Sequence, residues 1–171
     1  AGCGRRAPGR GLIGQYAREG ASLGCWRKRG AKLQAIGVSR GGRNTKVHAL
    51  SDGAGRLLAF RLTGGNAADA PQAAWLLATL PENVIVLADK AYDADAIRRL
   101  IEARGSTPNI PFKTTRRWKG CFSPVLYKGR NAVERMFCRL KDFRRIATRY
   151  DKRADTFMAA LHITAIIAYW L

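Results

Sequence analysis

Hydrophobic and polar residues alternate along two neighbouring segments in the first half of the chain. Residues 45–50 and 56–62 each carry apolar side chains at about every second position, and the turn-forming sequence Ser-Asp-Gly-Ala-Gly lies between them. This pattern predicts a β-hairpin with one buried face. A further strand ahead of residue 45 would complete a three-stranded antiparallel meander.

Helical and buried-strand patterns follow the hairpin. Asp69 and a nearby proline predict the start of a helix over residues 69–80, because both residue types favour a first turn. The short run 84–88 is apolar on both faces, which is typical of a strand covered by helices on two sides. These segments predict a helix followed by a central strand.

The second half of the chain is predicted to be mainly helical. Asp93 is expected to cap the helix that follows the central strand. Residues 107–112 are expected to form a short strand, and their prolines favour a sheet edge. A basic, irregular loop follows over residues 113–126. Apolar stripes then predict two closing helices, which begin at residue 131 and near residue 154.

Together these elements predict one α/β domain with a ribonuclease-H-like mixed sheet, in which an antiparallel meander is joined by parallel strands and flanked by helices. A flavodoxin-like sheet would alternate strands and helices from the start, and the front hairpin argues against it. Residues 1–35 are rich in Gly and Arg and show little periodicity. We therefore expect a basic, poorly ordered N-terminal remnant over residues 1–35, a folded domain over 36–171, and a first strand that is degraded or missing.

The charge of the chain points to a polyanionic partner. Lysine and arginine number 31 against 12 aspartates and glutamates, which gives a formal net charge of +19. The excess is concentrated in residues 1–46 and 113–153. A field of this strength favours DNA, RNA or an acidic membrane as a partner, although a generally basic proteome would give the same total. The apolar segment 157–171 is too short to span a bilayer comfortably and is expected to be a buried helix.

The sequence shows neither a zinc-binding pattern nor an export signal. The four cysteines show no C-x-x-C spacing and the chain has two histidines, so a zinc site is not expected. No signal peptide is visible, which makes the cytoplasm the expected compartment.

Two carboxylates are candidates for chemistry. Asp89 follows the central strand, at the edge where open α/β sheets place their sites, and it either binds a cation or caps the next helix. Glu134 lies in a predicted helix, with Arg130 one turn before it and Lys141 two turns after it. Glu134 is either held ionised by these cations for a metal or forms half of a capping box with Asn131.

A set of basic and aromatic residues adjoins these carboxylates in sequence and is expected to contact DNA. Its members are Lys113, Arg116, Arg117, Trp118, Lys119, Arg144, Arg145 and Arg149. The cations would bind phosphates, although each alone is more often a solvated surface residue. Trp118 either stacks on a base splayed out of the duplex or folds back onto the core.

Tyr127, Arg130, Glu134 and Lys141 form the spaced pattern Y-x2-R-x3-E-x6-K, and in this the chain resembles the DDE transposases of bacterial insertion sequences. The segment around Asp89 resembles that of the family's second catalytic aspartate. The resemblance implies a ribonuclease-H-like fold and two divalent metals, Mg²⁺ or Mn²⁺, held in part by Asp89 and Glu134. It implies supporting roles for the Tyr, the Arg and the Lys of the signature. It also implies cleavage of DNA at insertion-sequence ends, strand transfer into target DNA, homo-oligomeric assembly, and a place at the nucleoid with no membrane partner.

The family's first aspartate, which belongs on the first strand, has no counterpart here. No aspartate precedes Asp52, which is expected at the opposite end of the sheet from Asp89. Asp69 is expected at the correct end, as a stand-in roughly 10 Å, or two strand spacings, from the required position; its other explanation is a helix cap.

The missing carboxylate leaves two interpretations. One is a transposase that is truncated or frame-shifted at its N-terminus, with an incomplete metal site and impaired cleavage. The alternative is a basic nucleic-acid-binding module without catalysis. The first requires Asp89 and Glu134 to converge at one end of the sheet, whereas the second leaves them apart.

Overall fold

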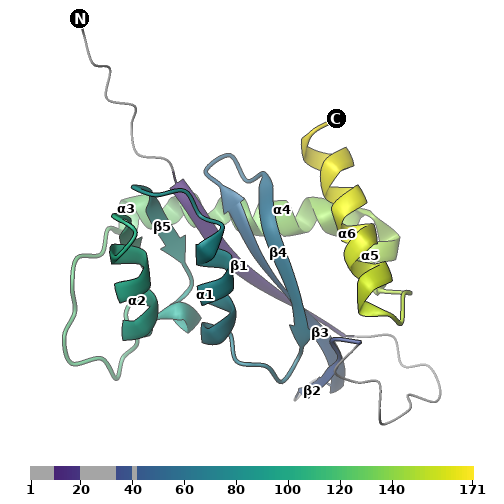
Figure 1. The fold of residues 1–171 in the computed structure, drawn as a ribbon, viewed down its shortest axis with the longest axis horizontal. Coiled ribbons are helices and arrows are strands. Elements are labelled where there is room, and N and C mark those ends of the chain that lie inside the picture. The colour runs from purple at the N-terminus through teal and green to yellow at the C-terminus, as the bar shows by residue number, and fades with distance from the viewer. Residues whose placement is uncertain (1–9, 20–33, 40–41) are drawn as a thin grey trace, which may run out of the picture.

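A mixed six-stranded β-sheet forms the centre of the computed structural model, which describes residues 10–19, 34–39 and 42–171 (Figure 1). The strands lie in the order β2-β3-β1-β5-β6, and β4 also pairs with β3. They are β1 (Arg10–Glu19), β2 (Gly37–Ser39), β3 (Gly42–Asp52), β4 (Leu57–Gly64), β5 (Ile85–Ala88) and β6 (Thr107–Asn109).

Helices cover both faces of this sheet. The α-helices are α1 (Ala70–Ala78), α2 (Asp95–Glu102), α3 (Pro124–Tyr127), α4 (Asn131–Asp142), α5 (Arg144–Thr148) and α6 (Ala154–Tyr169). Two short 3₁₀ helices, η1 (Lys90–Tyr92) and η2 (Lys128–Arg130), follow β5 and α3. The described segments include no helix long and apolar enough to cross a membrane.

The strand directions are those of the predicted sheet. β3 is antiparallel to both β1 and β4, β5 lies parallel to β1, and β6 lies parallel to β5. The hairpin, the central strand and the short edge strand are therefore confirmed, although β6 ends three residues earlier than expected.

The first strand is present, so the expectation that it is missing was wrong. β1 is a ten-residue strand inside the segment 1–35, and it pairs with β3 on one side and β5 on the other. A gap between β3 and β5 would leave two rows of central backbone groups unpaired. These backbone groups need partners whether or not the side chains of the strand between them alternate regularly. The other residues of the predicted remnant, apart from 34 and 35, lie outside the described residues, and its boundary stays a prediction.

Alternation along the central strands separates two hydrophobic cores. Leu50 of β3 and Val86 of β5 pack with α1 and α2 on one face. Val47 and Leu87, from the same strands, pack with α4, α5 and α6 on the other. Figure 1 shows α1 and α2 on the side of the sheet away from α4. Because both faces are covered, β5 is apolar throughout, as its sequence predicted.

Asp93 does not cap the helix that follows it, so this prediction was wrong. Ala94 occupies the N-cap position of α2 and makes no side-chain capping bond. The Asp93 carboxylate is instead buried and accepts hydrogen bonds from a later loop. Three N–H donors satisfy a buried carboxylate better than one helix turn can, which explains the different use of this aspartate.

Candidate functional site

Asp89 occupies the turn that directly follows β5. Its backbone is extended, and its carboxylate accepts a hydrogen bond from the backbone N–H of Lys90 at 2.6 Å, which caps η1. The side chain remains 38% exposed. The capping interpretation is therefore correct for one carboxylate oxygen, while the second oxygen faces another partner.

Arg130 joins Asp89 to Glu134. Its Nη2 lies 3.3 Å from Asp89 Oδ2, and its Nη1 lies 2.8 Å from Glu134 Oε1. The Arg130 side chain is only 17% exposed, whereas the Glu134 side chain is 60% exposed. The two carboxylates thus converge on one cation at the carboxyl end of β5, although 45 residues separate them in sequence.

The rival explanation for Glu134, a capping box with Asn131, was wrong. α3, η2 and α4 follow one another without a break, so Asn131 already has helical backbone geometry and no side-chain capping bond forms at the start of α4. Glu134 therefore has no free helix end to cap. Its carboxylate turns back by one turn to Arg130, a spacing that suits an ion pair on a helix surface.

Tyr127 and Lys141 take different places relative to this pair. The Arg130 guanidinium lies 5.8 Å from the centre of the Tyr127 ring, and burial raises the pKa of the tyrosine hydroxyl, which keeps it protonated. Lys141 lies two turns beyond Glu134 on α4, where it lines a small apolar cavity with Phe137 and Phe157. The signature thus spans the site and the core beside it.

The other two aspartates considered for the site form ion pairs of their own, and Asp69 follows β4, at the same end of the sheet as Asp89. Asp52 ends β3, pairs in register with Gly11 at the start of β1, and forms an ion pair with Arg56 at 2.7 Å. It belongs to the opposite end of the sheet, as expected. Asp69 precedes α1 without a side-chain capping bond and forms an ion pair with Lys46 at 3.1 Å.

Among the residues that the structure describes, no third carboxylate joins Asp89 and Glu134. Within residues 10–19, 34–39 and 42–171, no three His, Cys, Asp or Glu side chains are grouped so that they could hold a metal ion. The pair of Asp89 and Glu134 is bridged by a guanidinium, which supplies the positive charge that a metal would otherwise bring.

Three of the predicted DNA contacts are engaged within the protein. Arg116 forms ion pairs with Asp93 and Asp95, and Arg145 forms one with Asp151 at 2.7 Å. Arg149 is buried, where it donates to Thr45 and to the backbone carbonyl of Gln34. Buried guanidinium groups need such partners. The structure therefore contradicts Arg149 as a surface contact, and it ties Arg116 and Arg145 to carboxylates.

The remaining predicted contacts are on the surface. They are Lys113, Arg117, Trp118, Lys119 and Arg144. Trp118 is 87% exposed, so the interpretation that it folds back onto the core was wrong. These side chains remain available to a partner.

Two buried polar clusters were not recognised as such from the sequence. In the first, His48 contacts Thr63 at 2.8 Å and the hydroxyl of Tyr92 at 3.5 Å. Burial lowers the pKa of His48 to about 4, and burial also raises the pKa of Tyr92. The alternation of β3 places position 48 on an inward face, and this was the available signal. Since Tyr92 ends η1, the cluster anchors the turn that begins at Asp89.

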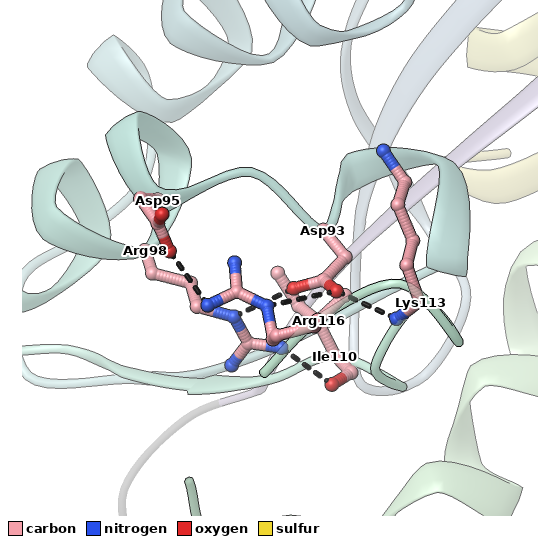
Figure 2. A network of polar contacts seen from close by, with 6 residues as sticks. All are labelled: Asp93, Asp95, Arg98, Ile110, Lys113 and Arg116. Carbon is pink, nitrogen blue, oxygen red and sulfur yellow. Dashed lines mark hydrogen bonds and ion pairs between the residues drawn. The ribbon is translucent and has the colours of Figure 1, made fainter. Parts of the chain in front are cut away.

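Figure 2 shows the second cluster, which centres on Asp93. Its carboxylate accepts from Arg98 at 2.9 Å, from Arg116 at 3.1 Å and from the backbone N–H of Lys113 at 2.7 Å. Burial raises the pKa of Asp93, but these three donors outweigh it and hold the pKa below its ordinary value. The cluster ties the loop after β6 to α2.

Comparison with known proteins gives one consistent result. Residues 7–171 match the family model described as Transposase DDE domain. A Brucella ovis protein, named as a transposase for insertion sequence element IS6501, is 39% identical over 128 residues, which cover 74% of this chain and 98% of that protein. A Burkholderia cepacia protein, named likewise for element IS402, is 32% identical over 137 residues, which cover 74% of this chain and 63% of that protein.

Solved structures share the fold at low identity. The catalytic core domain of BIV integrase matches with a TM-score of 0.51 and 18% identity, over 92% of this chain and 80% of that chain. The piggyBac transposase, in a synaptic complex with hairpin DNA, matches with a TM-score of 0.58 and 10% identity, over 95% of this chain and 46% of that chain. These likenesses confirm the predicted ribonuclease-H-like fold.

Proposed function

Since this chain belongs to the Transposase DDE domain family, whose function is DNA transposition, we propose that it binds DNA at insertion-sequence ends and that its own metal-dependent cleavage and strand transfer are impaired. The convergence of Asp89 and Glu134 on Arg130 carries the first part of this proposal. Asp89 and Glu134 are also the two positions that the family resemblance assigns to catalytic carboxylates. The absence of a third carboxylate among the described residues carries the second part.

The residues present do not fit a two-metal site. Family members generally use a divalent metal, and a pair of hard cations needs several carboxylate oxygens. Here one oxygen of Asp89 accepts from the Lys90 N–H, and the other faces Arg130. Glu134 faces the same guanidinium. We therefore propose that Mg²⁺ or Mn²⁺ binds weakly at this position and that catalysis is largely lost.

The exposed cations support DNA as the partner. Lys113, Arg117, Lys119 and Arg144 lie on the surface of a chain whose net charge is +19. Such residues bind phosphates without reading sequence. The proposed partners are insertion-sequence ends and target DNA, with assembly as a homo-oligomer at the nucleoid.

The test compares binding with cleavage on one substrate. A labelled duplex that carries an insertion-sequence end is titrated with protein at several salt concentrations, and the same mixtures receive Mg²⁺ or Mn²⁺. Salt-dependent binding with little or no nicking is expected. Efficient nicking that Asp89→Ala abolishes would overturn the proposed impairment. No binding even at low salt would overturn the function as a whole.

A further inference from the structure

An apolar stripe runs along the outer face of α6. The side chains of this α6 stripe follow one another at helical spacing, and each is between 48% and 59% exposed; they are Ile163, Ile166, Ile167 and Trp170. The opposite face of the helix, with Phe157, Leu161 and Ala165, packs in one hydrophobic core with residues of α4 and β4. α6 is therefore apolar on both faces, although only one face is buried. A helix that is apolar all round is normally covered all round.

Leu58 of β4 enlarges this surface. The Phe60 ring lies 4.4 Å from the His162 ring, measured between their centres. The Arg56 guanidinium lies 5.1 Å from the centre of the Trp170 ring. Leu58 lies between these two points of contact with α6 and is 46% exposed. Among the described strands β4 pairs with β3 alone, so the apolar patch formed by the α6 stripe and Leu58 reaches an edge of the sheet.

The size of the patch suits the centre of a protein interface. Five large apolar side chains that are each about half exposed form a patch of roughly 300–600 Å², a size that is often functional on a monomer. A standard interface covers about 800 Å² on each partner and has a polar rim around an apolar centre. The patch is therefore large enough for such a centre.

The distribution of charge argues against DNA and against a membrane as the partner of this patch. Residues 156–171 include no Asp, Glu, Lys or Arg, in a chain with 31 lysines and arginines. Arg56 borders the patch, but Asp52 pairs with it at 2.7 Å. Phosphates are bound by cations, and helices that lie on a membrane carry Lys and Arg on their polar face. The patch therefore fits an uncharged apolar protein surface.

A second copy of the chain offers such a surface. Two copies with a net charge of +19 each repel one another wherever their cations meet, so they approach most easily through an uncharged patch. The α6 stripe also complements itself. If two α6 helices pack antiparallel about a two-fold axis near Ile166 and Ile167, the shorter Ile163 of one copy lies opposite the larger Trp170 of the other.

This arrangement leaves the carboxylate pair open. Figure 1 shows α6 on the other side of the molecule from α3 and β5, the elements that lead to Arg130 and Asp89. A copy bound to the patch would therefore not cover the Asp89 end of the sheet in either protomer.

We infer that the chain forms a two-fold dimer in which the α6 stripes of two copies pack antiparallel, with Leu58 at the border of the interface. This inference deepens the proposed function and rests on it only for the expectation that copies associate. It assigns the surface through which they do so.

Sedimentation velocity without DNA tests the dimer. Wild-type protein is expected to dimerise in the micromolar range, and more tightly as salt rises, because salt screens the repulsion between the copies. DNA binding should respond to salt in the opposite direction. Ile166→Gln should weaken dimerisation by about 30-fold, the loss typical of a central interface residue, whereas Ile166→Leu should keep it. Val125→Gln, which changes a 77% exposed side chain on α3, is the matched control and should behave as wild type.

A mixing experiment tests the antiparallel arrangement. Ile163→Lys and Trp170→Glu should each weaken dimerisation when alone. An equimolar mixture of the two variants should recover it, because the introduced amine of one copy then lies opposite the introduced carboxylate of the other. In a parallel pair each position would face its own counterpart, and mixing would restore nothing.

The outcomes separate this inference from the proposed function. Wild-type protein that stays monomeric at every salt concentration, Ile166→Gln that dimerises as wild type does, or a mixture that fails to recover would each overturn the inference. A monomeric wild type whose thermal stability falls in Ile166→Gln would also overturn it, because another part of the same chain would then cover the stripe. A dimer that fails to bind DNA would instead overturn the proposed DNA binding and leave the dimer surface in place.

Discussion

Arg130 donates from Nη2 to the Asp89 carboxylate at 3.3 Å, across 41 residues of sequence. This one contact brings the end of β5 to the start of α4. The same guanidinium holds Glu134, so both carboxylates of the family resemblance depend on the position of a single side chain. Removing that side chain tests whether the arrangement stabilises the fold as well as the site.

Arg130→Gln is expected to lower the free energy of unfolding by about 1 kcal/mol, as measured by urea denaturation. Arg130 is mostly buried but its partners are partly exposed, so solvent screening keeps the loss small. Arg135→Gln, on the exposed side of α4, is the matched control and should change stability by less than about 0.5 kcal/mol. Equal losses in the two variants would show that the bridge contributes nothing.

Gly14→Asp is expected to supply the missing carboxylate. Gly14 of β1 pairs in register with Ala49 of β3, and the preceding Ile13 pairs with Ala88 of β5. Position 14 is therefore level with Asp89. It also shares the sheet face of Ala49, which packs in the same core as the helix that carries Glu134.

The readout for Gly14→Asp is Mn²⁺ affinity, measured by calorimetry before any DNA is added. Binding should tighten by at least about 10- to 100-fold, because loss of groups that only orient metal ligands already costs that much. Gly14→Asn has nearly the same size without the charge and should bind Mn²⁺ as wild type does. If both variants behave alike, the register does not place position 14 beside Asp89. Nicking of insertion-sequence DNA by Gly14→Asp alone would be the stronger form of success.

The sequence predicted strands β3 to β6 and the convergence of two carboxylates. Strand periodicity identified β3, β4 and β5, and their directions follow from the order of elements. β1 was not found, because its pairing depends on backbone groups on both sides and its own sequence lacks a regular pattern. Local patterns were also misleading where a carboxylate binds a residue distant in sequence, as Asp93 binds Arg116. Burial of Arg149 was equally invisible, because a run of arginines resembles a surface.

Asp93→Ala is expected to destabilise the protein by about 3–5 kcal/mol, because it leaves two arginines without the carboxylate that they share. It should also release the loop after β6. Limited trypsin digestion would then cleave after Arg116 or Arg117 faster than in wild type.

Asp155→Ala is the control for Asp93→Ala, since it removes an exposed ion pair with Arg153. It should leave trypsin cleavage of the loop unchanged. Loop cleavage that does not change in Asp93→Ala would contradict the anchoring role.

Asp93 should also make the stability of the protein depend on pH. Because its pKa is held below its ordinary value, its contribution to stability is present above the unfolded pKa and is lost as the pH falls through the folded pKa.

His48 should make stability depend on pH between about 6.5 and 4. Burial lowers its pKa from 6.5 to about 4, so the unfolded chain binds a proton that the folded chain excludes. Stability is therefore full above pH 6.5 and falls as the pH drops, with a total loss on the order of 3 kcal/mol near pH 4. Urea denaturation at half-unit intervals of pH would measure the slope.

His48→Asn should flatten that slope between pH 6.5 and 5, where the carboxylates are still largely ionised. An amide at this position can still form a hydrogen bond with Thr63, the partner of His48 at 2.8 Å. An unchanged slope in the variant would assign the pH dependence to other groups.

Arg144 and Arg149 should respond in opposite ways to substitution, although both belong to one basic stretch of sequence. Arg144 is exposed, so Arg144→Ala should leave stability unchanged and reduce the slope of log affinity for DNA against log salt by about 0.9, the value for one lost phosphate contact. Arg149 is buried under contacts with Thr45 and Phe157. Arg149→Ala should cost about 2 kcal/mol or more of stability and leave the salt slope of the folded protein unchanged. A reduced salt slope in Arg149→Ala would mean that this guanidinium reaches DNA after all.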